Sequence, residues 1–290
     1  MLLQLISLHR QYSLPDLDFI LTTDDGCPQR PPQDALRGNN PSDRCYQQVM
    51  MPDATFGGWP EAHLPSWSEA QWLVYRASID QPFPERQDGL FFRGAVTNHI
   101  RKIAAGSALL QRSPLVDVRI APWGDTAQYL LHMRGQTYSA RLKYLLACGS
   151  AVVFPWLSEE PQEWWYPALQ NGTNVLLTGD ITEGNQASPV MDALHALRRN
   201  ESWAEAIGVE GRNLALTLLH PDNVARYWVE LLTLYAALMT DPVKLHRDAV
   251  PLSHEFLRKQ RVWKHRERTC EVCTLSHTDS TRHHQSSSLQ

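Results

Sequence analysis

Short apolar runs alternate with helical patterns along most of this chain, and that alternation constrains the fold more than any other feature. Runs rich in strand-forming residues occur at 89–94, 116–120, 129–133, 151–154 and 174–177. Between two of them, residues 136–148 carry apolar side chains at helical spacing and end at Gly149, a residue that stops helices. Strand, helix and strand in this order form a βαβ unit with parallel strands. The sequence therefore predicts an α/β fold.

Further segments extend this pattern toward both ends of the chain. Leu17–Thr22 reads as a buried strand that ends near two carboxylates, and a long irregular connection rich in Pro, Gly, Asn and Asp runs from Cys27 to Pro52. Ser188 is expected to cap a helix with Pro189 at its first position, and Asp222 to cap a last helix that runs to about Met239. At 290 residues, the chain is long enough for two domains.

Bulk properties exclude two classes of partner. The net charge of -4 gives no overall field that would attract nucleic acid or anionic lipid. No run of about 18 apolar residues is present, so we expect no membrane span. Residues 1–10 are apolar but have neither a basic start nor a small-residue cleavage site, which favours an amphipathic helix over a signal peptide.

The cysteines and two glycosylation sequons say little about the compartment. Cys27 and Cys45 flank one loop and could pair in an oxidising lumen. Asn171-Gly172-Thr173 and Asn200-Glu201-Ser202 are sequons, but so short a pattern recurs by chance. Near the end of the chain, Cys270 and Cys273 lie among histidines and could form a zinc clip, although the polar composition favours a disordered tail over 259–290.

The most informative stretch runs from Tyr129 to Ser150. A strand, a glycine and a helix with Ser139 and Arg141 in its first turns suit a phosphate, because free backbone N–H groups and the helix dipole favour an anion. An arginine can also bind a diphosphate with two hydrogen bonds. On spacing alone, Arg141 and Lys143 fit equally well as solvated residues of a helix.

This stretch resembles the donor-binding motif of the Rumi-type protein O-glucosyltransferases (glycosyltransferase family 90), a family with fungal capsule-associated xylosyltransferases and KDEL-containing glucosyltransferases. The residues that match the motif are Arg134, Gly135, Ser139, Arg141, Lys143, Gly149 and Ser150. The resemblance extends over roughly residues 14 to 240. It implies a UDP-sugar site formed by Ala95, Arg101, Arg134, Gln136, Thr137, Tyr138, Ser139, Ala140 and Arg141.

Two other segments match the family in the same order. Phe91-Phe92-Arg93-Gly94 with Arg101 resembles a family strand and a downstream arginine that contacts the nucleotide sugar. Ala95 stands where the family often has serine, so only its backbone can take part in hydrogen bonds. Asp25 follows the strand over Leu17–Thr22 and matches the family's catalytic aspartate, which removes a proton from the acceptor hydroxyl. Without the resemblance, Asp24-Asp25-Gly26 reads as an ordinary turn.

The acceptor side is matched less closely. Residues 51–61 resemble the family's acceptor-side segment, with Ala54 where the family has tryptophan. Residues 163–167 match a segment whose aromatic rings line the region beyond the donor, although a Trp-Trp pair is more often a packing surface. His132 and His220 are expected to be structural.

The resemblance implies two Rossmann-like domains that face each other across a cleft, the GT-B arrangement. We expect a partial acceptor-side domain over 1–87, lacking about a hundred leading residues of the family, and a donor domain over 88–240 whose last helix crosses back. The reaction implied is inverting transfer of glucose or xylose from UDP-glucose or UDP-xylose to a protein or glycan hydroxyl, without a metal or other cofactor, in the endoplasmic reticulum or Golgi lumen. Two alternatives are a sugar- or protein-binding relative without turnover and a nucleotide-sugar hydrolase.

Overall fold

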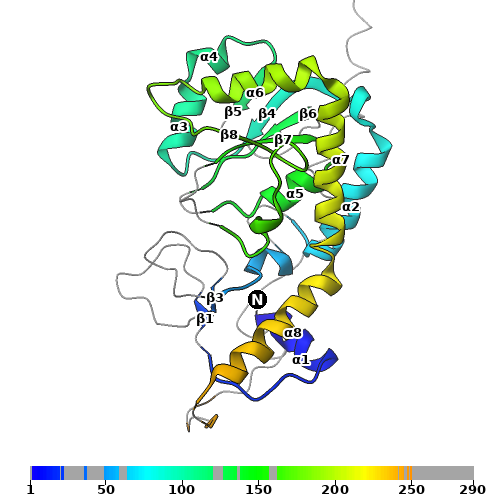
Figure 1. The fold of residues 1–290 in the computed structure, drawn as a ribbon, viewed down its shortest axis with the longest axis vertical. Coiled ribbons are helices and arrows are strands. Elements are labelled where there is room, and N and C mark those ends of the chain that lie inside the picture. The colour runs from blue at the N-terminus through cyan, green and yellow to red at the C-terminus, as the bar shows by residue number, and fades with distance from the viewer. Residues whose placement is uncertain are drawn as a thin grey trace, which may run out of the picture.

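The computed structural model describes residues 2–19, 21–22, 36–37, 49–58, 64–119, 127–135, 138–156, 162–240, 242–244, 247 and 249. This part of the chain is a mixed α/β structure with parallel sheets, which confirms the predicted α/β class (Figure 1). The two-domain GT-B arrangement stays a prediction. The expected disordered tail, 259–290, lies outside the described residues, as do Cys27, Cys45, Cys270 and Cys273. No helix among the described residues is long and apolar enough to cross a membrane.

A five-stranded sheet forms the larger part of the molecule. Its strands are β4 (Gln87–Arg93), β5 (Val116–Arg119), β6 (Ala127–Leu131), β7 (Ala151–Pro155) and β8 (Leu176–Thr178). The order is β5-β4-β6-β7-β8, and every neighbouring pair is parallel. All five predicted strands are confirmed, with their ends within two residues of the expected positions. Continuous apolar runs are typical of parallel strands because both faces of such a sheet are covered.

Alternate side chains of each strand enter two separate cores. Leu90 and Phe92 on β4 pack in a core with helices α3 (His99–Gly106) and α6 (Ser188–Arg199), whereas Phe91 packs on the opposite face. That second face is covered by α2 (Trp67–Asp80), α5 (Leu142–Ala147) and α7 (Glu201–Thr217) (Figure 1). A short helix, α4 (Ala108–Gln111), leads from α3 to β5.

Helix α2 joins this second core through two hydrogen bonds to the end of α7. Trp67 donates from Nε1 to the Leu219 carbonyl at 2.6 Å, and Gln71 donates from Nε2 to the Ala215 carbonyl at 2.8 Å. Both side chains are buried. Helix α2 therefore packs with the five-stranded sheet, although it precedes residue 87 in the sequence. The domain boundary expected near residue 87 stays a prediction.

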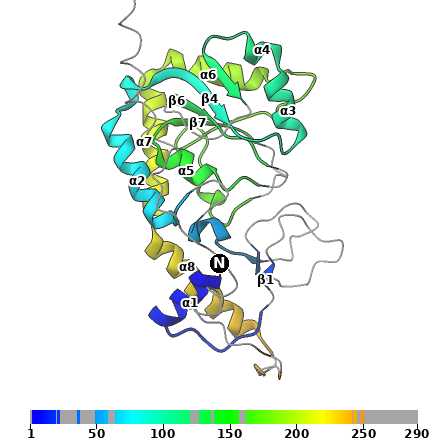
Figure 2. The same ribbon diagram turned by 180° about the vertical axis from the view of Figure 1, so that it is seen from behind.

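The N-terminal part of the chain lies beside the last helix. Helix α1 (Leu2–Gln11) confirms the predicted N-terminal helix, and Figures 1 and 2 both show it next to α8 (Pro221–Leu238). A small parallel sheet has the order β1-β2-β3, with strands Leu21–Thr22, Leu36–Arg37 and Val49–Met50. Helix α8 contacts this part through Tyr227, whose hydroxyl donates to the Met50 carbonyl at 2.9 Å, and through the rings of Phe19 and Tyr235.

Three expectations about local structure are wrong. The strand expected over Leu17–Thr22 does not include residues 17–19, because its parallel partner β2 pairs with only Leu21 and Thr22. The helix cap expected at Asp222 is instead His220, whose Nδ1 accepts a hydrogen bond from the Asp222 N–H at 3.3 Å. Pro221 suits the first helical position, so the cap moves to the residue before it. Similarly, Ala187 precedes α6 and Ser188 is already helical.

The helix expected over 136–148 is also much shorter. It is the six-residue α5, so Ser139 and Arg141 lie in the turn before the helix and not in its first turns. The Gly135 N–H donates to the Tyr138 carbonyl at 3.2 Å, which turns the chain before α5 begins. Three short 3-10 helices complete the described structure: η2 (Ala54–Gly57), η4 (Phe83–Glu85) and η5 (Tyr166–Ala168).

Candidate functional site

The predicted donor residues gather at the carboxyl ends of β4 and β6. The next strand in the chain after β4 is β5, which lies on one side of it, while β6 lies on the other. The connection after β4 therefore runs toward β5, and the connection after β6 runs in the opposite direction, toward β7. In parallel α/β sheets, ligands bind in the crevice that such a reversal creates. Gly94 and Ala95 follow β4 at this point, and Met133, Arg134 and Gly135 follow β6.

Arg101 holds the two connections together. Its guanidinium donates to the carbonyls of Ala95 at 3.0 Å, Met133 at 2.9 Å and Arg134 at 2.8 Å. It also lies 3.5 Å from the Ser139 hydroxyl. Three of the other predicted site residues, Ala95, Arg134 and Ser139, are thus brought into contact with Arg101. Because its donors are directed at main-chain oxygens, Arg101 orders the loops of the site, and its direct contact with a nucleotide sugar stays a prediction.

The turn that contains Arg101 is fixed by Asn98. The side-chain oxygen of Asn98 accepts from the Arg101 N–H at 3.0 Å and caps α3, while its amide donates to the Gly135 carbonyl at 2.5 Å. One side chain therefore begins the helix and attaches it to the loop after β6. Asn98 is not among the predicted site residues, although an Asn three residues before Arg101 is a recognisable capping signal.

Arg141 approaches the same place from the other side. It is almost fully buried, donates from Nη1 to the Arg93 carbonyl, and its guanidinium carbon lies 4.5 Å from the centre of the Phe92 ring. A Cβ on Gly94 would lie 3.0 Å from that ring and 3.2 Å from Arg141 Nη1. The glycine that ends the Phe91–Gly94 motif is therefore what leaves room for the arginine.

These contacts concentrate positive charge in a buried place. Burial lowers the pKa of Arg101 to about 10, and burial together with the nearby charge of Arg101 lowers the pKa of Arg141 to about 9. His132 is completely buried against Phe154, and burial, Arg141 and Arg101 all lower its pKa well below the ordinary value. The imidazole is therefore neutral. A bound anion would relieve the repulsion between the two guanidinium groups.

The other predicted site residues divide into two groups. Arg134 accepts hydrogen bonds at its carbonyl from Arg101 and Asn98, and Ala140 accepts one from Lys143 Nζ at 3.1 Å. Asp25, Gln136 and Thr137 lie outside the described residues. The proposed base and part of the loop after Gly135 therefore stay predictions.

A buried polar network lies beside the site and connects three matched segments. Asp53 accepts hydrogen bonds from the Tyr138 hydroxyl at 2.6 Å and the Thr55 hydroxyl at 2.7 Å, and it lies 3.7 Å from Lys143 Nζ. Lys143 also donates to the Thr55 hydroxyl. The acceptor-side segment around Asp53 is thereby attached to the donor segment 138–143. The contact with Asp53 also shows that the Tyr138 hydroxyl is used within the protein.

Glu163 completes this network as a second buried carboxyl. Burial raises its pKa to about 8, with Lys143 opposing and Asp53 adding to the shift. Its Oε2 accepts from Trp165 Nε1 at 3.1 Å, whereas its Oε1 has no hydrogen bond among the described residues. A protonated Glu163 leaves one cation, Lys143, opposite one anion, Asp53. Nothing in the local sequence pattern around Asp53 or Glu163 indicates that they lie near Lys143.

The Trp-Trp pair behaves as a packing surface. Trp165 is buried against Tyr166, and Trp164 lies 4.2 Å from the ring of Tyr227 and 6.3 Å from that of Phe56. Helix α8 is thereby joined to the acceptor-side segment. The structural interpretation of this pair is confirmed.

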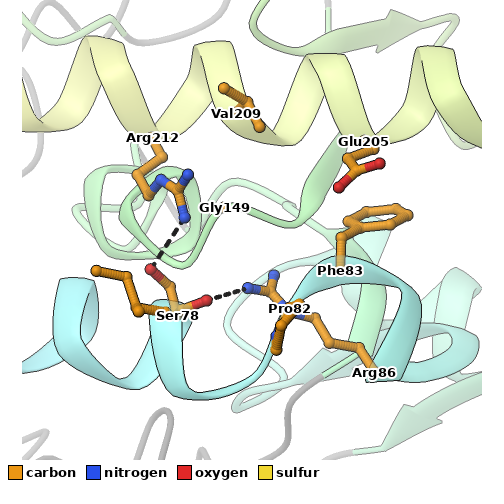
Figure 3. Close-up of a pocket in the computed structure, with 9 residues that line it drawn as sticks. Ser78, Pro82, Phe83, Arg86, Gly149, Glu205, Val209 and Arg212 are labelled. Carbon is orange, nitrogen blue, oxygen red and sulfur yellow. Dashed lines mark hydrogen bonds between the residues drawn. The ribbon is translucent and has the colours of Figure 1, made fainter.

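A hollow lies at the opposite edge of the sheet from the predicted donor residues (Figure 3). Its volume is about 230 Å³, and it is bordered by α2, by α7 and by Gly149. Arg86 donates to the Ser150 hydroxyl at 2.8 Å and to the Ser78 carbonyl at 3.2 Å, and Arg212 donates to the Ser78 hydroxyl at 3.2 Å. Gly149 and Ser150, which match the end of the donor motif, therefore support the sheet at its amino edge and lie apart from the switch point.

The described part of the chain is thus a parallel α/β protein with a cationic site at its topological switch point. A sequence model of glycosyl transferase family 90 matches residues 1–286, and the chain belongs to this family. Protein O-glucosyltransferase 1 of Rattus norvegicus is 26% identical over 233 residues, covering 70% of this chain and 57% of the relative. The human protein of the same name is 26% identical over 225 residues, covering 67% of this chain and 55% of its own length.

The chain thus spans just over half the length of these curated relatives. Among solved structures, Anabaena HepE in complex with UDP-glucose is similar with a TM-score of 0.38 and 11% identity, over 56% of this chain and 52% of that one. Sucrose-phosphate synthase from Thermosynechococcus elongatus gives a TM-score of 0.36 and 15% identity, over 65% of this chain and 50% of that one.

Proposed function

We propose that this protein transfers glucose or xylose from a UDP-sugar to a hydroxyl of an acceptor protein or glycan. The observation that carries this proposal is the meeting of Ala95, Arg101, Arg134, Ser139 and Arg141 at the switch point of the parallel sheet. Two buried guanidinium groups there favour a diphosphate. Membership in family 90 and the likeness to protein O-glucosyltransferase 1 support transfer of a glycosyl group.

In the proposed reaction the Asp25 carboxylate removes the proton of the acceptor hydroxyl. The hydroxyl oxygen then attacks the anomeric carbon from the side opposite UDP, the bond from that carbon to the diphosphate oxygen breaks, and the configuration inverts. UDP leaves with the electron pair of that bond. The Arg101 and Arg141 region stabilises the charge of the leaving diphosphate, so the proposal includes no metal ion.

The acceptor would bind on the side of the 51–58 segment. That segment is attached to the donor residues through Asp53, Tyr138 and Lys143, which suits a cleft between a donor part and an acceptor part. We propose a GT-B arrangement, and the domain boundary near residue 87 follows from the resemblance to the family and not from these contacts. The relatives named protein O-glucosyltransferase support a protein acceptor and a place in the lumen of the secretory pathway.

An assay of UDP release tests the proposal. The full chain is incubated with UDP-glucose and with UDP-xylose, each with and without serine-containing acceptor domains and glycans. We expect UDP release that depends on the acceptor. The rate of this release should fall by more than about 100-fold in Asp25→Asn, and Arg141→Ala should lose UDP binding. Arg112→Ala, which removes an exposed arginine at the end of α4, is the matched control.

Other results separate the two alternatives. Release of UDP without acceptor would identify a nucleotide-sugar hydrolase, and sugar binding without release would identify a binding protein that has lost turnover. Near-normal transfer by Asp25→Asn would show that another group is the base. Unchanged UDP binding in Arg141→Ala would place the donor elsewhere.

A further inference from the structure

Two exposed asparagines outside the donor site share a geometry that suits a covalent modification. Asn171 begins the sequon Asn171-Gly172-Thr173, and Asn200 begins the sequon Asn200-Glu201-Ser202. Each asparagine is exposed, and so is the hydroxyl residue two positions later. The sequence alone gave no reason to distinguish them from chance matches.

Among the described residues, the side chain of each asparagine makes hydrogen bonds only through its carbonyl oxygen. Asn171 Oδ1 accepts from the Leu177 N–H at 2.9 Å. Asn200 Oδ1 accepts from the Trp203 N–H at 3.1 Å and from the Ser202 hydroxyl at 3.0 Å, and it caps α7. Neither Nδ2 donates a hydrogen bond to a described residue. A glycan on Nδ2 replaces one N–H and leaves the carbonyl as an acceptor, so both folded segments can keep their hydrogen bonds.

The two sequons are also neighbours in space. Trp203 follows the second sequon, and its Nε1 donates to the carbonyl of Gly172, in the middle of the first, at 2.9 Å. Trp203 also lies 3.6 Å from where a Cβ on Gly172 would be. The two asparagines therefore belong to one surface, which is held together by the indole.

This surface lies away from the donor residues. Residues 171–175 lead into β8 at its first residue, Leu176, which places them at the amino edge of the parallel sheet. Gly94 and Arg134 follow the carboxyl ends of β4 and β6, at the opposite edge. A bulky group on Asn171 or Asn200 therefore leaves the switch point open.

We propose that Asn171 and Asn200 both carry N-linked glycans when the chain is made in the secretory lumen, and that the two glycans cover this one surface. The inference rests on the luminal location given with the proposed function. The co-reactant is an oligosaccharide attached to a lipid through a diphosphate. The asparagine Nδ2 forms the new bond to the anomeric carbon, the bond from that carbon to the diphosphate breaks, and the amide proton is released as the lipid diphosphate departs.

The test uses the full chain behind a cleavable secretory leader in cultured animal cells, with intact mass measured before and after an amidase that removes N-linked glycans. We expect two glycans. Thr173→Ala and Ser202→Ala should each remove one, and the double variant both, whereas Thr173→Ser and Ser202→Thr should keep both. Thr173→Ala leaves the Asn171 hydrogen bond intact because the Thr173 side chain has no hydrogen bond to a described residue.

A secreted chain whose mass does not fall on amidase treatment overturns the proposal. If only one glycan is present, the proposal is overturned for the asparagine whose variant leaves the mass unchanged. The measurement is the mass of the chain and not its sugar transfer. Glycans on Asn171 and Asn200 would therefore be detected or excluded even if the chain failed to bind a UDP-sugar.

Discussion

Glu163 is a described residue whose protonation affects the stability of the folded chain. It is fully buried with Lys143 and Asp53, and one of its oxygens accepts only from Trp165. The pKa of about 8 in the folded state lies above the ordinary value of 4.5 because burial disfavours the charged form. The folded chain therefore keeps a proton that the unfolded chain releases.

The sign of the resulting pH dependence follows from proton binding. Between pH 4.5 and 8 the folded state binds more protons than the unfolded state at Glu163, so the free energy of unfolding falls as pH rises. The contribution is fully present below pH 4.5 and lost above about pH 8. One proton gives a slope of at most about 1.4 kcal/mol per pH unit.

We predict that Glu163→Gln removes this slope. Glutamine is always neutral and keeps a carbonyl to accept from Trp165 Nε1, so between pH 5 and 8 the wild-type chain should lose up to about 4 kcal/mol relative to the variant. Urea unfolding followed by tryptophan fluorescence at several pH values measures this difference. Glu230→Gln, at an exposed position of α8, is the control and should keep the wild-type slope. Parallel curves for wild type and Glu163→Gln would contradict a protonated Glu163.

At the scale of elements, α7 approaches the turn before β7 closely at Gly208. A Cβ on Gly208 would lie 2.4 Å from the carbonyl oxygen of Gly149 and 3.1 Å from the carbonyl carbon of Ser150. Both neighbours are main chain, so neither can rotate away. The helix and the turn can therefore meet only where the helix has no side chain.

Gly208→Ala is therefore expected to lower the free energy of unfolding by about 3 kcal/mol or more, despite the better helix propensity of alanine. Gly106→Ala in α3 is the matched control, because no atom lies within 4 Å of its Cβ position. That variant should be neutral or up to about 1 kcal/mol more stable. Urea unfolding of both variants gives the comparison, and equal effects would show that α7 can move away from Gly149.

The five strands could be predicted because their apolar runs are local. The start of α5 could not, because Tyr138 has the spacing of a helical residue yet lies in a turn and donates to Asp53. The packing of α2 on α7 and the meeting of Asp53 with Glu163 depend on contacts between distant segments, which no local pattern contains. The motif that ends at Gly94 is recognisable in the sequence. Only the structure shows why a glycine is needed there, since a side chain would occupy the space of Arg141.

At the scale of the whole molecule, Lys143 links the acceptor-side segment to the donor part. It is completely buried and pairs with Asp53, and it donates to Thr55 in the same segment. Breaking a buried ion pair from one side costs more than removing both partners, because the remaining charge stays buried without compensation. The pair therefore holds two parts of the chain together through charge.

We predict that Lys143→Met lowers the free energy of unfolding by about 3–5 kcal/mol, because it leaves Asp53 as a buried anion without its cation. Adding Asp53→Asn should recover at least about 1.5 kcal/mol of that loss. The double-mutant cycle is measured by urea unfolding at pH 6, where Glu163 is protonated. Additive effects of the two substitutions would mean that the pair does not connect the two segments.

The parallel order of the large sheet also governs how the molecule is made. Strand β4 pairs with β5 on one edge, but its other edge stays open until β6 has emerged, and β6 in turn waits for β7. No two neighbouring strands are joined by a tight hairpin that could form early. Apolar strand edges are thus exposed for much of synthesis. Folding of this chain is therefore expected to be slow compared with that of a helical bundle and to depend on chaperones that shield those edges.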